Sequence, residues 1–261
     1  MSPDEQPNHL QIVTTADGSN TIYNSLVGEN YHSRHGALQE SRHVFVKSGL
    51  EYFLENNPNN NKYVSILEVG FGTGLNFLLS ADFCTQQQIN LQYTGIEAYP
   101  LTDEMISKTG YDQYVPSPIW ESFLQHYPAS LAASVQLNNY IQLQIAATTL
   151  ANFSSPVQYD VIYFDAFAAV HQPEMWSEEA IIHTLKFLKP DGVFVTYAIT
   201  GNLKRTIKAL GLKVQKAPGA PGKREMLRAV NPDVQIWGYA DVEINCLSLT
   251  TFALTNSTIC H

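Results

Sequence analysis

Three glycines fall within five residues directly after an apolar run, in the stretch ILEVGFGTGLNF at positions 66–77. Because Gly70, Gly72 and Gly74 have no Cβ, the backbone can turn tightly there and approach a ligand at van der Waals distance. In an open parallel sheet the first strand-to-helix turn usually lines the ligand site. A tight turn without a ligand would need the same residues. The surrounding sequence must therefore show whether the turn binds a ligand.

The spacing around the bend argues against a dinucleotide. The third glycine of a GxGxxG fingerprint, which lets the helix approach a pyrophosphate, would fall on Leu75. The next predicted strand ends at Glu97, 23 residues after Gly74, where a carboxylate can accept hydrogen bonds from two ribose hydroxyls. This combination resembles the S-adenosylmethionine-dependent methyltransferases, whose cofactor is cationic and suits an acidic pocket. The resemblance implies cofactor contacts by Glu68, Gly70, Phe71, Gly72, Thr73, Gly74, Asn76, Glu97 and Ala98.

Asp165 is the candidate catalytic residue. It follows the apolar run at 160–164, and at the carboxyl end of a central strand its side chain would lie beside the cofactor's methyl group. An N-cap or turn aspartate is the alternative interpretation. Phe167 and Trp176 follow in the same loop, where a flat heterocycle could stack on them, although both could also be packing residues.

These residues need a doubly wound α/β fold with a mostly parallel, Rossmann-like sheet. Strands that read as apolar runs alternate with helical patterns, which indicates a parallel sheet covered on both faces. The expected strands are 64–69, 91–98, 141–146, 160–167 and 193–199, and the expected helices are 74–83, a mixed stretch within 101–133, 177–189 and 202–210.

Two hairpins and a helix are expected outside this alternation. Asp17-Gly18 between β-prone runs predicts an N-terminal hairpin over 10–27, and apolar spacing predicts a helix over 36–55. A further hairpin is expected at 212–230, with its turn at 218–222. We therefore divide the chain into an extension at 1–62 packed on the main domain, a methyltransferase domain at 63–230, and a tail of unassigned role at 231–261.

Composition indicates an ordinary globular protein. Of 261 residues 44% are hydrophobic, and neither a secretory signal nor an apolar run of membrane-spanning length is visible. Three cysteines without a CxxC pair argue against a zinc site, so we expect no metal and a cytoplasmic location. The net charge is −9, yet residues 186–228 carry ten basic and two acidic side chains (+8), against −17 elsewhere. This asymmetry suggests an anionic partner, although a solvated helical face would look the same.

Several motifs in order resemble the methyltransferase module of the MnmC family of tRNA-modification proteins. They cover about residues 10–230 and comprise Tyr31-His32-Ser33, ESRHVF at 40–45, the glycine bend, EAYPL at 97–101, DAFAAVHQPEMW at 165–176 and GKREMLRA at 222–229. The resemblance implies methyl transfer from S-adenosylmethionine to the amine of 5-aminomethyl-(2-thio)uridine at the tRNA wobble position, in the anticodon region. It implies substrate or phosphate contacts by Tyr31, Ser33, Glu40, Ser41, Phe167, Trp176, Lys204, Arg205, Lys223 and Arg224.

The chain departs from this family in three ways. Ala169 stands where the family usually has proline, and residues 146–149 lack the acidic residue that reaches the adenine amino group in relatives. No FAD-dependent oxidoreductase module fits after Val230, so a stand-alone methyltransferase is expected. The alternatives are a small-molecule methyltransferase, a catalytically idle RNA-binding protein of the same fold and, disfavoured by Leu75, a dinucleotide oxidoreductase. The sequence indicates nothing about oligomeric state.

Overall fold

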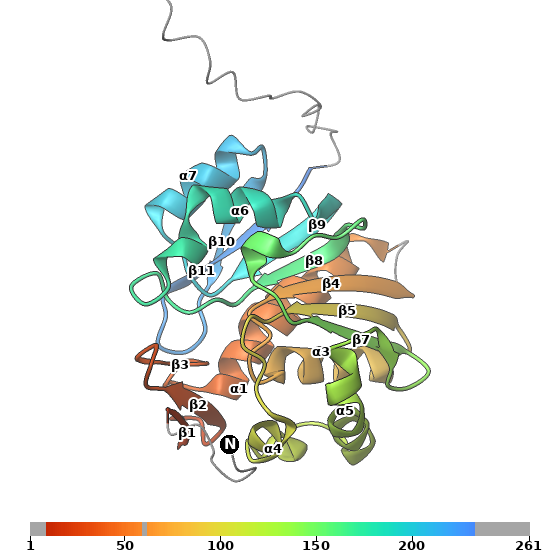
Figure 1. Ribbon diagram of the computed structural model, residues 1–261. Helices are drawn as coiled ribbons and strands as arrows, with labels where there is room; N and C mark the ends of the chain where they lie inside the picture. Colours follow the sequence, from red (N-terminus) through yellow and green to blue (C-terminus); the bar gives the residue numbers. More distant parts are fainter. Residues whose placement is uncertain (1–8, 59–61, 233–261) are drawn as a thin grey trace, which may run out of the picture.

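The computed structural model describes residues 9–58 and 62–232. Except for residues 231 and 232, the expected C-terminal tail lies outside this range. The described residues form one large sheet with helices on both faces, and a small sheet beside it (Figure 1).

The large sheet has eight strands in the order β10-β11-β9-β8-β4-β5-β7-β6. The five central strands, from β9 to β7, run parallel, whereas β6 and the β10–β11 hairpin are antiparallel to their neighbours. This confirms the predicted doubly wound, mostly parallel class and the C-terminal hairpin. The strands are β4 (Tyr63–Val69), β5 (Asn90–Ile96), β6 (Val135–Gln136), β7 (Ile141–Ala146), β8 (Tyr159–Phe164), β9 (Leu188–Thr196), β10 (Lys213–Pro218) and β11 (Glu225–Val230).

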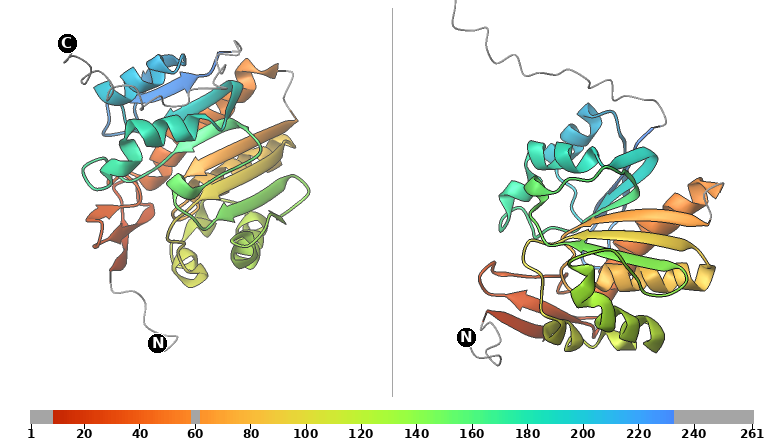
Figure 2. Two further views of the ribbon diagram at one scale, coloured as in Figure 1. Left: turned by 45° about the horizontal axis from the view of Figure 1, so that its top comes forward. Right: turned by 45° about the vertical axis from the view of Figure 1, so that its right-hand side comes forward.

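Helices cover both faces of this sheet. The two further views in Figure 2 show α6 and α7 together on one face, and α3 and α5 on the other. The predicted helices are present with shifted ends, and the mixed stretch resolves into α4, a short 3₁₀ turn and α5. The elements are α3 (Leu75–Gln87), α4 (Asp103–Ser107), η3 (Tyr111–Gln113), α5 (Ser117–Ser130), η4 (Leu150–Asn152), η5 (Pro173–Trp176), α6 (Glu178–Leu185) and α7 (Gly201–Ala209).

The helix predicted over 36–55 exists, but its middle is a π-helix. It consists of α1 (Ala37–Glu40), η1 (Ser41–Glu51) and α2 (Tyr52–Asn56). It packs so close to β8 and β9 that a Cβ on Gly49 would lie 2.9 Å from the Tyr163 ring. Its apolar residues share one core with β4 and β8. The expected division at residue 62 is therefore not a packing boundary, because this helix is part of the domain core.

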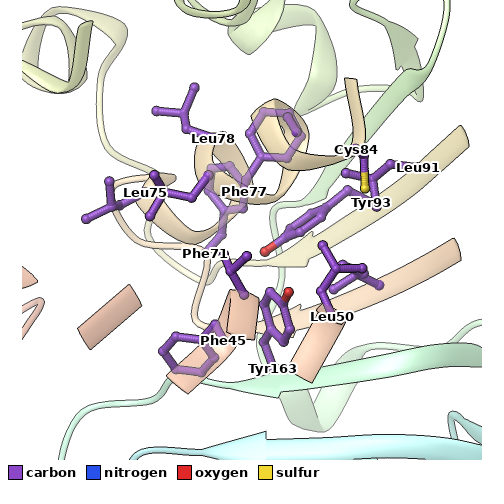
Figure 3. Close-up of a cluster of buried hydrophobic side chains, with 14 of the residues drawn as sticks. Phe45, Leu50, Phe71, Leu75, Phe77, Leu78, Cys84, Leu91, Tyr93 and Tyr163 are labelled. Atoms are coloured by element: carbon purple, nitrogen blue, oxygen red, sulfur yellow. The ribbon is translucent and has the colours of Figure 1, made fainter. Parts of the chain in front are cut away.

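Strand alternation decides which core each residue of β4 enters. Ile66 packs in the core under α3 and η1, and Leu67 packs in the core under α6 and α7. Glu68 therefore points to the same side as Ile66, into the layer where the Tyr93 and Tyr163 side chains lie among aromatic and aliphatic neighbours (Figure 3). This orientation governs what Glu68 can do in the site.

The small antiparallel sheet lies at the carboxyl edge of the large one. It consists of β1 (Leu10–Thr14), β2 (Asn20–Asn24) and β3 (Glu29–Asn30), and the predicted N-terminal hairpin is its β1–β2 pair. The Ala168 amide donates to the Glu29 carboxylate at 2.8 Å, and the Tyr111 hydroxyl donates to the Asn20 carbonyl at 3.2 Å. The first contact holds the small sheet against the loop that follows β8, and the second holds it against η3 (Figure 1).

Candidate active site

The glycine bend brings two other segments against the end of β4. Gly70, Gly72 and Gly74 have φ of 87°, 52° and 80°, the left-handed region that favours glycine. A Cβ on Gly70 would lie 2.5 Å from the Asp165 carbonyl oxygen, and one on Gly72 would lie 2.8 Å from the Tyr31 ring. The bend thus admits close approach by the protein itself, and this approach positions Asp165 and Tyr31.

A cavity of about 1490 Å³ runs from the bend toward α6. This is larger than the roughly 300–1,000 Å³ of an ordinary ligand pocket. Seven of the nine predicted cofactor residues line it, together with Asp165: Gly70, Phe71, Gly72, Thr73, Asn76, Glu97 and Ala98.

Glu97 lies at the end of β5, as predicted, and is tied to the bend. Its two carboxylate oxygens accept from the amides of Gly72 at 2.9 Å and Tyr99 at 3.0 Å. Burial raises the pKa of Glu97, and the backbone hydrogen bonds act in the opposite direction. Since each carboxylate oxygen can accept more than one hydrogen bond, Glu97 can still receive two ligand hydroxyls.

Glu68 does not contact the cavity, which corrects the prediction that it binds the cofactor. It is fully buried, and its two oxygens accept from the Asn76 side-chain amide and the Tyr93 hydroxyl, both at 2.8 Å. Burial, and then the nearby Asp165 carboxyl, raise its pKa well above the usual range. The reason is strand alternation, which turns Glu68 into the core under α3. Gly74 also lies outside the cavity lining, at the N-cap position just before α3.

A second cavity of about 380 Å³ meets the first one at Asp165. Both cavities are lined by Tyr31, His32, Asp165, Ala166 and Phe167. Tyr31 and Phe167 pack edge to face there, with ring centroids 5.1 Å apart. Of the predicted substrate residues, five line this smaller cavity: Tyr31, Ser33, Glu40, Phe167 and Lys223.

Asp165 is held by Asn76 at one of its two carboxyl oxygens. Its Oδ2 accepts from the Asn76 side-chain amide at 2.8 Å, and its amide donates to the Val69 carbonyl at 2.9 Å. Burial, followed by the charge of Glu40, raises the pKa of Asp165 to about 8, while the Asn76 hydrogen bond and Lys223 act to lower it. A carboxyl with this proton affinity can exchange a proton near neutral pH.

An ion pair closes one side of the smaller cavity. Lys223 Nζ lies 2.6 Å from Glu40 Oε1, and the other Glu40 oxygen accepts from the Ser33 amide at 2.8 Å. Lys223 also lies over the Tyr197 ring, 3.8 Å from its centroid. The Tyr197 hydroxyl in turn donates to the Ala166 carbonyl at 2.9 Å. The pair therefore ties α1 and the β10–β11 turn to the loop after β8.

The other predicted substrate residues lie outside both cavity linings. Trp176 donates its indole N–H to the Phe167 carbonyl at 2.7 Å and packs on Phe164, so it supports the loop after β8. Ser41 is fully buried, and its hydroxyl has no hydrogen-bond partner among the residues that the structure describes. Lys204 and Arg205 belong to α7, while Arg224 is exposed in the β10–β11 turn.

Sequence reasoning missed several residues of the site because their contacts span long sequence separations. His32 is buried against the Thr21 hydroxyl, and burial lowers its pKa to about 4, so its ring is neutral near pH 7. Glu29 lines the smaller cavity. The end of the larger cavity nearest α6 is lined by Thr148, Thr149 and the exposed Glu179. Residues 146–149, the segment in which relatives carry an acid for adenine, contain no acidic residue.

Two other features are absent from residues 9–58 and 62–232. No group of three His, Cys, Asp or Glu side chains there could hold a metal ion. No helix in the same range is long and apolar enough to cross a membrane.

Comparison with known proteins agrees with this geometry. Residues 116–232 match the family described as S-adenosyl-L-methionine-dependent methyltransferase. The chain is 31% identical over 247 residues to the tRNA 5-methylaminomethyl-2-thiouridine biosynthesis bifunctional protein MnmC of Magnetococcus marinus, covering 88% of this chain and 36% of the relative. The MnmC of Leptospira interrogans is 28% identical over 258 residues, covering 88% and 38%. The chain thus spans little more than a third of these curated relatives.

A solved structure shares the fold. MnmC2 from Aquifex aeolicus superposes with a TM-score of 0.67 at 23% identity, covering 87% of this chain and 72% of that one. The family match over residues 116–232 and the shared fold agree with the class of S-adenosyl-L-methionine-dependent methyltransferases. Within this class the chain is similar to the MnmC proteins over 88% of its length, which confirms the resemblance predicted from the sequence motifs.

The raised pKa of Asp165 predicts a pH-dependent stability. In the unfolded chain an aspartate ionises near pH 3.9, and in the folded protein near pH 8. The folded state therefore binds the proton more tightly, and this contribution to the free energy of unfolding is present below about pH 4 and lost as the pH rises to 8. Asp165→Asn should raise the melting temperature above pH 8 by about 2–8 °C, corresponding to about 1–2 kcal/mol, and by less at pH 5. Thermal scans across this range check it, and an equal shift at every pH would contradict it.

Proposed function

We propose that this protein transfers the methyl group of S-adenosylmethionine to the primary amine of 5-aminomethyl-(2-thio)uridine at the wobble position of tRNA, giving 5-methylaminomethyl-(2-thio)uridine. The observation that carries the proposal is the position of Asp165, which lines both cavities and is held by Asn76 at only one of its two carboxyl oxygens. The larger cavity would hold the cofactor and the smaller one the target base. The printed names of the MnmC relatives supply the substrate, and a tRNA substrate implies a cytoplasmic protein.

The residues of the larger cavity fit the proposed cofactor. The backbone of the bend leaves no side chain between Gly70, Gly72 and the cavity, and Glu97 offers acceptors for two ribose hydroxyls. When bound there, S-adenosylmethionine supplies a methyl group carried on a positively charged sulfur. The carboxyl of Glu97, and that of Asp165 once it has released its proton, give this cavity the negative charge that favours a cation.

Asp165 would accept the proton that the amine must lose. One N–H bond of the substrate ammonium breaks, the proton moves to Oδ1 of Asp165, and the electron pair stays on nitrogen for attack on the methyl carbon. The bonding pair between carbon and sulfur returns to sulfur, and the product amine carries the charge. Asp165 then releases its proton to water.

The raised pKa makes Asp165 a usable base for this step. An alkylamine with a lysine-like pKa lies about 2.4 units above a carboxyl of pKa about 8, so proton transfer costs about 3 kcal/mol. For an ordinary aspartate near 3.9 the gap is about 6.5 units, or about 9 kcal/mol. Holding nitrogen and methyl in line can supply roughly 7–11 kcal/mol, which exceeds the smaller cost but barely covers the larger one.

The smaller cavity suits a cationic amine attached to a flat ring. Three carboxyls face it, from Glu29, Glu40 and Asp165. Lys223 forms an ion pair with Glu40, which compensates its charge, and it also acts to lower the pKa of Asp165. The Tyr31 and Phe167 rings beside Asp165 offer faces or edges for a base that has left its stack.

For the tRNA backbone we favour the mouth of the smaller cavity over α7. Arg34 and His35 line this cavity and are exposed, and Gly222 of the β10–β11 turn packs against the His35 ring. The exposed Arg224 belongs to the same turn. Phosphate contacts position a nucleic acid without reading its sequence, so they are needed close to the target base.

The reaction can be tested directly. The protein is incubated with S-adenosylmethionine and tRNA carrying 5-aminomethyl-2-thiouridine, and nucleosides are analysed. We expect 5-methylaminomethyl-2-thiouridine. In Asp165→Asn kcat should fall by about 10²–10⁴, the usual contribution of a general base, whereas the Kd for the cofactor should change by less than about threefold.

Other outcomes distinguish the alternatives. Methylation of the free nucleoside but not of tRNA would indicate a small-molecule enzyme. Absence of cofactor binding in calorimetry would indicate the idle RNA-binding protein. Full turnover by Asp165→Asn would leave the family intact but refute the role of Asp165.

The proposed phosphate surface has a matched control. Arg34→Gln with Arg224→Gln removes two positive charges at the cavity mouth, and Lys204→Gln with Arg205→Gln removes two from α7. The first pair should raise the KM for tRNA about tenfold and reduce the slope of log affinity against log salt by about one to two. The second pair should change each by much less. A larger effect of the α7 pair would place the tRNA on the other face.

A further inference from the structure

One side-chain amide connects two carboxyl groups beneath the site. Asn76 lies in the first turn of α3, is only 2% exposed, and donates its two Nδ2 hydrogens to Glu68 Oε1 and Asp165 Oδ2, both at 2.8 Å. Glu68 comes from β4 and Asp165 from the end of β8, two strands that pair directly. Within residues 9–58 and 62–232 the Asn76 carbonyl oxygen, Oδ1, is buried and has no hydrogen-bond partner. In this part of the chain the two carboxyls are therefore the groups that orient the amide.

This orientation restricts where protons can reside. An oxygen that accepts from Nδ2 has one of its lone pairs taken by the N–H, so a proton is favoured on the other oxygen of the same carboxyl. The second oxygen of Glu68, Oε2, accepts from the Tyr93 hydroxyl at 2.8 Å. For Asp165 the favoured oxygen is Oδ1, which is not bonded to Asn76.

We propose that Asn76 is a positioning residue that directs proton exchange by Asp165 to Oδ1, the oxygen that Asn76 does not hold, by using both amide hydrogens to hold Glu68 and Asp165. This inference rests on the proposed function. It differs from the sequence expectation, in which Asn76 and Glu68 both contact the cofactor. Here Glu68 acts only through Asn76, as the buried acceptor that keeps the amide turned toward Asp165.

Other groups around Asp165 bear on its titration. Glu29 of β3 and Glu40 of α1 disfavour its charged form, whereas Lys223 of the β10–β11 turn and the Asn76 amide favour it. The Tyr197 hydroxyl is engaged by the Ala166 carbonyl, and His32, His171 and Arg34 line the smaller cavity. Among the described side chains, the Asn76 amide is the one that both bonds to a defined Asp165 oxygen and has its other hydrogen anchored in the core. It can therefore select between the two oxygens.

The main test is Asn76→Leu, which keeps the side-chain branching but removes both donors. We expect kcat for tRNA to fall about 10- to 100-fold, because the carboxyl can then rotate and take its proton on either oxygen. The acid limb of the kcat/KM profile should move to higher pH by about one unit, since the ionised form of Asp165 loses a hydrogen bond. The Kd for S-adenosylmethionine should change by less than about threefold.

Ser80→Ala is the matched structural control. Ser80 lies one turn further along α3, is buried, and donates to the Asn76 backbone carbonyl at 2.8 Å. Losing this hydrogen bond should lower stability without altering turnover or the pH profile. If Asn76 had only a structural role, both variants would lose stability and neither would move the acid limb.

A second pair of variants tests the role of Asn76 if Asn76→Leu does not fold. Glu68→Gln keeps an acceptor for the Asn76 amide and a partner for Tyr93, whereas Glu68→Leu keeps neither. Glu68→Gln should therefore retain most of the turnover that Glu68→Leu loses. Folded variants of Asn76 or Glu68→Leu with wild-type kcat and an unmoved acid limb would overturn the inference. A wild-type protein without activity would instead refute the proposed function.

Discussion

The site depends on the close approach of two strand ends. Gly70 lies so near the Asp165 carbonyl that a Cβ would reach 2.5 Å from it, and the Asp165 amide donates to the Val69 carbonyl at 2.9 Å. Only a residue without a side chain and with positive φ can stand there. This contact fixes where β8 delivers Asp165, and the neighbouring Gly72 admits Tyr31 from the N-terminal segment in the same way. The two cavities meet where these approaches converge.

The same enclosure that positions Asp165 also sets its chemistry. Burial raises its proton affinity, and the bond from Asn76 and the charge of Lys223 only partly offset this effect. Such a carboxyl is costly in the free protein but useful beside a cationic donor and an amine that must lose a proton. Glu68 bears a similar cost of burial with both of its oxygens hydrogen-bonded. The structure thus keeps two carboxyls in an environment that disfavours their charge, and connects them through a single amide.

Much of the fold could be predicted from the sequence, because apolar runs, Asp17-Gly18 and the glycine bend are local signals. The same holds for Glu97 and Asp165, which stand at strand ends. Glu68 was misplaced because its neighbours Leu67 and Val69 are both apolar and the strand is buried on both faces, so nothing in its pattern shows which side an acid enters. The π-helical segment was not predicted, since its apolar spacing is hard to distinguish from 3.6 over so few residues. Lys204 and Arg205 were chosen from charge density along the chain, which says little about position in space.

The account's central claim is that a carboxyl of high proton affinity faces the charged methyl donor, and proton release on cofactor binding measures it most directly. At pH 7 Asp165, with a pKa of about 8, is mostly protonated. A cation bound nearby should lower this pKa by about one unit. Calorimetry in buffers of different ionisation enthalpy should then detect about four tenths of a proton more from the wild type than from Asp165→Asn. Equal proton release by the two proteins, with cofactor bound in both, would contradict the account.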